Sequence, residues 1–217
     1  MATTARSRLL EIALLAAGLI AALLFIADVG KDSVVARVIL KSVPLLCLIV
    51  WVRWAAHDHY ATFILAGLIF SLAGDVLLEI SDDLFVPGLI AFLIGHVGYI
   101  AAFLAVTREL KLPRALPFAA WVVFAYLLLL PNLGSMVIPV AAYVIVIGTM
   151  MWRASATATS PVLHWQWFAL IGAILFGLSD TLLAFKKFSG VTLGPSFSII
   201  VLYWLGQLGL ALSVKRL

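Results

Sequence analysis

The chain has 217 residues, of which 65% are hydrophobic and 11% are charged, and its mean hydropathy is +1.20. A soluble domain of this size does not need so much apolar surface, whereas a helical membrane protein needs an apolar run of about 20 residues for each span. The net charge of +4 is therefore assigned to basic loops at a membrane surface and not to nucleic-acid binding. The single cysteine, Cys47, excludes a disulfide framework and a thiolate metal site.

Eight apolar runs follow one another along the chain and predict a single all-α domain over residues 1–217, a membrane bundle of eight transmembrane helices. The first run follows Arg6 and Arg8, as the core of a signal peptide would, but it is long for that role and is interpreted as a retained span. The fifth run is short and is set off by prolines. The expected spans are residues 9–27, 34–52, 60–78, 84–106, 116–130, 136–152, 163–184 and 195–214.

The distribution of Lys and Arg between the two ends of these spans predicts the orientation. Nine basic residues fall on the side of the N-terminus, namely Arg6, Arg8, Arg53, Arg108, Lys111, Arg114, Arg153, Lys215 and Arg216. Four fall on the other side, namely Lys31, Arg37, Lys186 and Lys187. Because cytoplasmic loops carry the excess of Lys and Arg, we expect both termini in the cytoplasm of a multi-pass protein of the bacterial inner membrane.

Two aspartates occupy matching apolar contexts. Asp75 lies in Gly67-Leu-Ile-Phe-Ser-Leu-Ala-Gly-Asp75-Val-Leu-Leu, and Asp180 lies in Gly172-Ala-Ile-Leu-Phe-Gly-Leu-Ser-Asp180-Thr-Leu-Leu. An acid inside an apolar helix costs several kcal/mol unless it faces protein or water, so each is a candidate functional residue. Gly95-His-Val-Gly-Tyr also resembles Gly206-Gln-Leu-Gly-Leu. Two parallel four-helix repeats are one interpretation, and chance similarity between glycine-rich helices is the other.

The helical rise of about 1.5 Å per residue places polar side chains from different spans at similar depths. Asp75 and Asp180 are expected about 8 Å below the outer ends of their spans. Lys41, Tyr143 and Tyr203 are expected about 10–12 Å below the outer surface. Three further polar residues are expected deeper, near the midplane: His96, Tyr99 and Gln207. The polar atoms therefore gather in the outer half of the membrane.

Each of these residues also has a structural interpretation. The two acids can form a buried structural pair with Lys41, and Lys41 can instead pair with Asp28 or Asp32 at the outer surface. Back-bonding to their own helices is the alternative for Ser71 and Ser179. A satisfied interhelical hydrogen-bond pair is the alternative for His96 and Tyr99. A solvated loop accounts for Glu79, Asp82 and Asp83, and His57-Asp58-His59 is typical of a polar loop more than of a metal site.

The residue types favour acid–base chemistry. The chain has no Gly-x-Ser-x-Gly nucleophile elbow and no Gly-rich phosphate loop, and only His96 lies well within a span, too few for a three-histidine zinc site. Two carboxylates in apolar surroundings resist ionising together, so one can serve as an acid while the other stays ionised. Such a pair suits a lipid bond that is broken by protonation through an oxocarbenium-like cation. No metal and no cofactor are expected.

Six short motifs span most of the chain: Lys41-Ser-Val-Pro44, Ser71-Leu-Ala-Gly-Asp75-Val-Leu-Leu78, Gly95-His-Val-Gly-Tyr99, residues 143–150, Phe176-Gly-Leu-Ser-Asp180-Thr-Leu-Leu183 and Leu202-Tyr-Trp-Leu-Gly-Gln207. In order and spacing they resemble the YhhN-like lysoplasmalogenase family of eight-helix membrane proteins. The resemblance implies hydrolysis of the vinyl ether of a lysoplasmalogen to a fatty aldehyde and a glycerophospho-ethanolamine or -choline. Membrane lipids are the only partners expected, with no nucleic acid and no protein partner implied.

The expected catalytic pair is Asp75 and Asp180. One protonates the vinyl ether carbon, and the other stabilises the cation and directs water onto it; the sequence leaves open which does which. Lys41 is expected to hold the phosphate. The other expected substrate-binding residues are Ser71, Glu79, His96, Tyr99, Tyr143, Ser179, Tyr203 and Gln207. The alternatives are a small-solute or lipid transporter, and a lipid-binding membrane protein without catalytic activity.

Overall fold

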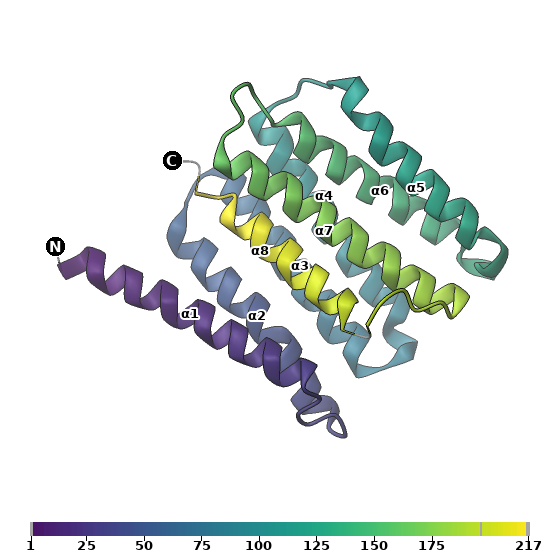
Figure 1. Cartoon of the computed structure of the whole chain (residues 1–217), viewed down its shortest axis with the longest axis horizontal. Coiled ribbons are helices and arrows are strands. Elements are labelled where there is room, and N and C mark those ends of the chain that lie inside the picture. The colour runs from purple at the N-terminus through teal and green to yellow at the C-terminus, as the bar shows by residue number, and fades with distance from the viewer. Residues whose placement is uncertain (1, 196, 216–217) are drawn as a thin grey trace.

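The computed structural model describes residues 2–195 and 197–215, with side chains from residue 9 onward. The described residues form eight α-helices, which confirms the predicted all-α fold (Figure 1). The helices are α1 Ala2–Ile26, α2 Val34–Ala55, α3 His59–Ile80, α4 Phe85–Val106, α5 Leu116–Leu129, α6 Val137–Ala156, α7 His164–Ala184 and α8 Ser198–Leu212. Short connecting turns are the 3₁₀ segments Asp82–Leu84, Leu112–Ala115, Leu130–Asn132 and Gly134–Met136 and the π-helical segment Phe185–Ser189.

Among the described residues, seven candidate membrane spans are long and apolar enough to cross a membrane: α1 to α7, where α4 to α7 are counted with the 3₁₀ or π-helical turns that adjoin them. Within the eighth predicted span, residues 195–214, the structure has a shorter apolar helix, α8, of 15 residues. At about 1.5 Å per residue, a helix of this length is shorter than a hydrocarbon core of about 30 Å. The expected span also included Pro195 and Phe197, which precede the first residue of α8.

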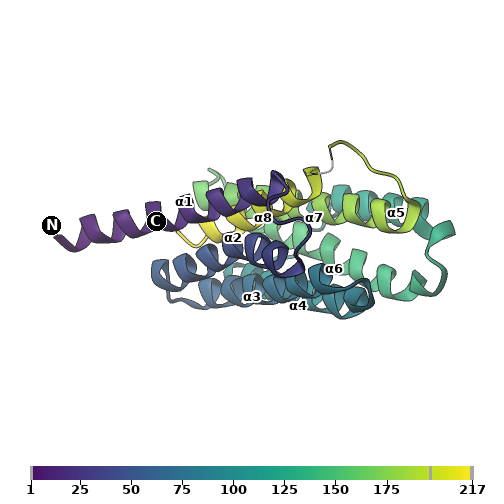
Figure 2. The same cartoon turned by 90° about the horizontal axis from the view of Figure 1, so that it is seen from below.

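The helices run alternately up and down, so α3 and α7 point the same way (Figure 1). The helices α2, α3, α4 and α6 follow one another in one layer, α7 and α8 lie over them, and α1 and α5 lie at opposite edges (Figure 2). The start of α1 and the end of α8 lie toward the same end of the bundle. The side of the membrane on which they lie stays a prediction. Of the basic residues counted for it, Arg216 and the side chains of Arg6 and Arg8 lie outside the described residues.

Close helix–helix contacts hold α3 against α4 and α7 against α8. A Cβ atom on Gly67 would lie 2.2 Å from the ring of Tyr99, and a Cβ on Gly172 would lie 2.7 Å from the backbone nitrogen of Leu210. Small residues let helix backbones approach this closely in membrane bundles. Asp75 and Asp180 each lie on the same helix as one of these glycines, so the two contacts fix the positions of the acids. The internal repeat stays a prediction.

Side chains at the helix ends define where the spans start. The side chains of Ser33 and Asp58 accept hydrogen bonds from the first turns of α2 and α3 and cap them, as is common for these residue types. The interpretation of Glu79 as part of a solvated loop is wrong, because α3 continues to Ile80 and the Glu79 side chain is only 12% exposed. The helix therefore carries Glu79 toward the same region as Asp75.

Candidate active site

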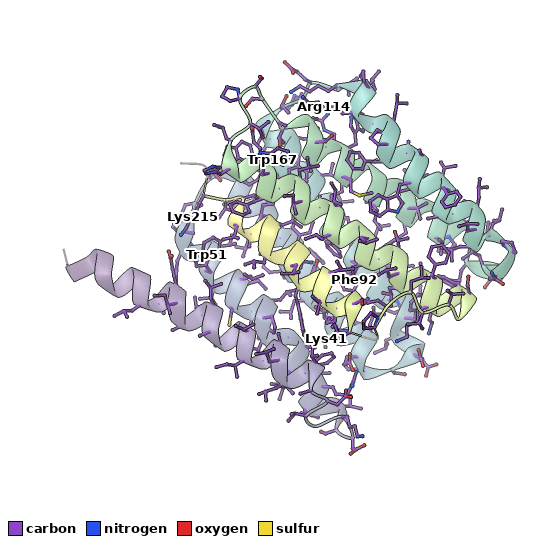
Figure 3. The ribbon with its side chains drawn as sticks, viewed as in Figure 1. Lys41, Trp51, Phe92, Arg114, Trp167 and Lys215 are labelled. Atoms are coloured by element: carbon purple, nitrogen blue, oxygen red, sulfur yellow. The ribbon has the colours of Figure 1, made fainter. Side chains whose placement is uncertain are left out.

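A polar cavity of about 510 Å³ opens at the end of the bundle away from the termini. In Figure 3, Lys41 and Phe92 lie toward this end, whereas Trp51 and Lys215 lie toward the other. The ends of α1, α3 and α7 and the beginnings of α2, α4 and α8 form its walls. Among the residues predicted for the site, those that line it are Lys41, Asp75, Glu79, Ser179, Asp180 and Tyr203.

Asp75 is held between two neighbouring helices. Its carboxyl group is buried, and Oδ2 accepts a hydrogen bond of 2.5 Å from the hydroxyl of Tyr203 on α8. The ammonium nitrogen of Lys41, on α2, lies 3.6 Å from Oδ1. The alternative pairing of Lys41 with Asp28 or Asp32 is wrong, since its partners are Asp75 and Glu79. The Asp75 carboxyl group thus faces a cation on one oxygen and a hydroxyl on the other.

Asp180 has different partners. Its Oδ2 accepts a hydrogen bond of 2.9 Å from the hydroxyl of Tyr143 on α6, and Nε2 of His96 lies 3.3 Å from the same oxygen. The other ring nitrogen, Nδ1, lies 2.6 Å from the carbonyl of Phe92. A carbonyl only accepts, so Nδ1 carries a hydrogen, and Nε2 is the ring nitrogen that faces the Asp180 carboxyl group. Among the described residues, no Lys or Arg forms an ion pair with Asp180. This carboxyl group and the ring can therefore share one proton.

A cluster of charges lies at the mouth of the cavity. Oε1 of Glu79 lies 2.5 Å from Nε of Arg37, and Oε2 lies 3.1 Å from Nζ of Lys41. The guanidinium of Arg37 also lies over the ring of Phe25, at 5.1 Å. Arg37 entered the sequence-based predictions only as one of the basic residues that indicate orientation. Its position four residues before Lys41, which puts both on one helix face, is the signal that was available.

A second polar group lies beneath the cavity and does not contribute to its described walls. Ser71, His96, Tyr99 and Gln207 are buried, as the predicted depths of the last three suggested. The hydroxyl of Tyr99, on α4, donates to Oε1 of Gln207, on α8, at 2.5 Å, which is an interhelical hydrogen bond of the kind expected for Tyr99. Back-bonding of Ser179 within its own helix is wrong, because its hydroxyl donates to the carbonyl of Ile199 at 2.8 Å.

Aromatic rings fix the orientation of the polar groups. Phe92 packs edge-on against Tyr203 and Phe176, with ring centroids 5.8 and 6.1 Å apart. The ring of His96 lies 4.5 Å from that of Phe176 and 5.4 Å from that of Tyr143. The edge-to-face contacts of Phe92 and Tyr143, and the tilted contact of His96 with Phe176, favour one orientation of each ring, so the partners of both aspartates are held in place. Phe92 was not among the residues predicted for the site, although it lies one helical turn before His96.

The fold and this cavity define a multi-pass integral membrane protein with two acids in a shared polar site. The chain belongs to the YhhN family, whose model matches residues 36–214, which confirms the resemblance noted in the sequence. It is similar to "Lysoplasmalogenase TMEM86A" of Homo sapiens, with 35% identity over 187 residues, 81% of this chain and 76% of that protein. No solved structure matches the chain.

Further relatives carry the same activity in their names. "Lysoplasmalogenase TMEM86B" of Mus musculus is 33% identical over 181 residues, 82% of this chain and 75% of that protein. The bacterial "Lysoplasmalogenase" of Mycobacterium bovis is 32% identical over 151 residues, 65% of this chain and 55% of that protein. The family therefore includes mammalian and bacterial members.

Proposed function

We propose that this chain is a lysoplasmalogenase, a membrane hydrolase that cleaves the vinyl ether bond of a lysoplasmalogen. The products are a fatty aldehyde and a glycerophospho-ethanolamine or -choline. The observation that carries the proposal is the pair of carboxyl groups in one polar cavity, Asp75 beside Lys41 and Asp180 beside His96. Different surroundings of two acids are what acid–base division of labour requires. The names of the relatives support the same reaction.

Asp180 is the group that we assign as the acid. Its carboxyl proton moves to the vinyl carbon farther from the ether oxygen, which leaves a positive charge shared by the nearer carbon and that oxygen. Water adds to the nearer carbon, and the proton it releases returns to the Asp180 carboxylate. The hemiacetal then transfers its hydroxyl proton to the ether oxygen, the carbon–oxygen bond breaks, and aldehyde and alcohol separate. One water is consumed and no net proton is used.

Asp75 is assigned to the cation and Lys41 to the phosphate. A carboxylate fixed by Tyr203 stabilises a positive charge that develops only in the transition state. Lys41 and the newly identified Arg37 are two of the cations that line the cavity, and they suit a phosphate. Both form ion pairs with Glu79, so a bound phosphate takes the place of the Glu79 carboxylate as their partner. The other groups near the pair position water or the ether oxygen: Ser71, His96, Tyr99, Tyr143, Ser179 and Gln207.

The proposal also includes the arrangement in the membrane. All eight helices, α8 included, lie in the bacterial inner membrane as two parallel four-helix repeats, with both termini in the cytoplasm. The charged mouth of the cavity then faces outward. The partial match of glycine contacts in α3–α4 and α7–α8 supports the repeat, since each hairpin closes on a glycine eight residues before its aspartate.

Release of aldehyde from a vinyl ether lysolipid by the purified protein tests the proposal and separates it from a transporter or a passive lipid-binding protein. Asp75→Asn and Asp180→Asn should each lower kcat by about 10²–10⁴-fold, the usual contribution of a positioned acid or base. The double variant should be hardly worse than either single one, because groups that act as a unit are not additive. Glu109→Gln, at an exposed carboxylate, is the matched control. Near-normal turnover of either Asn variant would contradict the mechanism.

A further inference from the structure

A second cavity, of about 50 Å³, adjoins the polar one and lies between α4, α5, α6 and α7. Its α5 wall is hydrocarbon, and so is its α6 wall apart from Tyr143; Val122, Ala125, Val144 and Ile147 are among the side chains that face it. Polar atoms reach it near the end that carries Asp180. It is therefore an apolar space that ends at one of the two acids.

Asp180 lies on the boundary between the two cavities. Asp75 and Lys41 line only the polar cavity, whereas Asp180 lines both, as do Leu78, Phe85, Phe92, Leu183 and Lys187. Tyr143, which donates a hydrogen bond of 2.9 Å to Asp180, lines only the apolar cavity. An amphiphile that crosses this boundary thus has its polar part beside Lys41 and its apolar part beside α5, with Asp180 at the junction.

We propose that the apolar cavity binds the first few carbons of the lipid's hydrocarbon chain, directly beyond the vinyl ether. This inference rests on the proposed function and adds the location of the chain. One water-sized group takes about 10–15 Å³ of such volume, so the cavity holds about four methylene-sized groups. It therefore recognises the carbons next to the reacting bond, and the rest of the chain passes out into the bilayer.

This placement explains why Asp180 and not Asp75 meets the vinyl carbon. In a vinyl ether the carbon that accepts the proton belongs to the hydrocarbon side, and the oxygen belongs to the headgroup side. A chain seated against α5 and α6 brings the hydrocarbon side to Asp180, while the headgroup remains with Lys41 and Arg37. The cation that follows lies between the two acids, within the polar cavity.

Filling the apolar cavity tests the inference. Ala125 on α5 is buried and faces it, so Ala125→Leu occupies the space with three added carbon atoms. Ala120→Leu makes the same change on the exposed side of α5 and is the matched control. The probe is 1-O-hexadecyl lysophosphatidylethanolamine, whose saturated ether binds but has no double bond to protonate. A second probe, glycerophosphoethanolamine, has the headgroup and no chain.

Thermal-shift titrations of the full chain should give a weaker Kd for the hexadecyl probe in Ala125→Leu by about tenfold or more, the effect expected from overpacking. The Kd for glycerophosphoethanolamine should not change, and Ala120→Leu should match the wild type for both probes. A decyl probe should show the same ratio of Kd between wild type and Ala125→Leu, because only the first carbons bind. Ala125→Val, which adds two carbons, gives the test if Ala125→Leu does not fold.

Each outcome separates this inference from the proposed hydrolysis. If the folded Ala125 variants bind the hexadecyl probe with the same Kd as the wild type, the inference is wrong, whether or not aldehyde is released. A loss of affinity that grows with chain length overturns the restriction to the first carbons. A wild-type protein that binds the saturated probe with this dependence on Ala125, but releases no aldehyde from the vinyl ether, refutes the hydrolysis and leaves the chain site in place.

Discussion

Replacing Tyr203 with Phe removes one hydroxyl from the site and leaves the ring in place. That hydroxyl donates to Oδ2 of Asp75 at 2.5 Å, and both groups are buried. The ring packs against Phe92 and Phe176 at centroid distances of 5.8 and 5.3 Å, and a phenylalanine keeps these contacts. The substitution therefore tests the hydrogen bond to Asp75 alone.

The expected loss of kcat follows from the free energy of the hydrogen bond between Tyr203 and Asp75. A hydrogen bond to a charged group contributes about 1.5–3 kcal/mol, and each 1.36 kcal/mol is tenfold in rate. If the hydrogen bond from Tyr203 to Asp75 is present in the transition state, where Asp75 stabilises the cation, Tyr203→Phe should lower kcat by about 10- to 150-fold. KM should change little, because Lys41 and Arg37, assigned to the phosphate, are untouched.

The assay is steady-state release of aldehyde, coupled to an aldehyde dehydrogenase, with the melting temperature of each variant measured in the same detergent. Tyr126→Phe is the control, since its hydroxyl donates to the carbonyl of Val137 at 3.2 Å and the residue lines neither cavity. A Tyr203→Phe variant with a normal melting temperature and a kcat within about twofold of the wild type would refute the role of Asp75 in the transition state.

Three further predictions follow from the same structure. Lys41→Met should raise KM by about tenfold or more with little change in kcat, because the phosphate contact exists in ground and transition states alike; an unchanged KM in an active variant would exclude that contact. Both termini are predicted to be cytoplasmic, so a reporter that is active only in the cytoplasm should be active when fused to either terminus. Labelling of the C-terminus from outside would contradict the predicted orientation. Gly172→Ala should lower the free energy of unfolding by about 1–3 kcal/mol, because its Cβ would lie 2.7 Å from the backbone nitrogen of Leu210. Gly18→Ala, whose nearest neighbour would lie 3.5 Å away, is the control, and equal melting temperatures would contradict the packing account.

The fold was predictable because hydropathy alone decides which segments enter the membrane. Seven of the eight expected spans correspond to long apolar helices, while α8 is shorter than its apolar run. Hydropathy does not show where the first helical turn forms, and the apolar residue Phe197 lies just before the first residue of α8. The neighbours of each helix were not predictable either, since they depend on contacts such as Gly172 with Leu210.

The site was partly predictable because depth follows from position in a span. This calculation grouped Asp75, Asp180 and Lys41, which line one cavity in the structure. Depth does not give the direction in which a side chain leaves its helix. The separate tyrosine partners of the two acids were therefore not foreseen, and Arg37 was assigned to the surface although it bonds to Glu79.

The meeting of a charged chamber and a hydrocarbon-walled one at Asp180 has a consequence for what happens after cleavage. On the proposed function, the two fragments have opposite solubilities and are formed on opposite sides of Asp180. Keeping one methylene group out of water lowers the free energy by about 0.8 kcal/mol, so a long-chain aldehyde partitions into the bilayer. The phosphate-bearing alcohol diffuses into the aqueous phase. The fragments are sorted between lipid and water as they separate, and neither has to pass the other to leave.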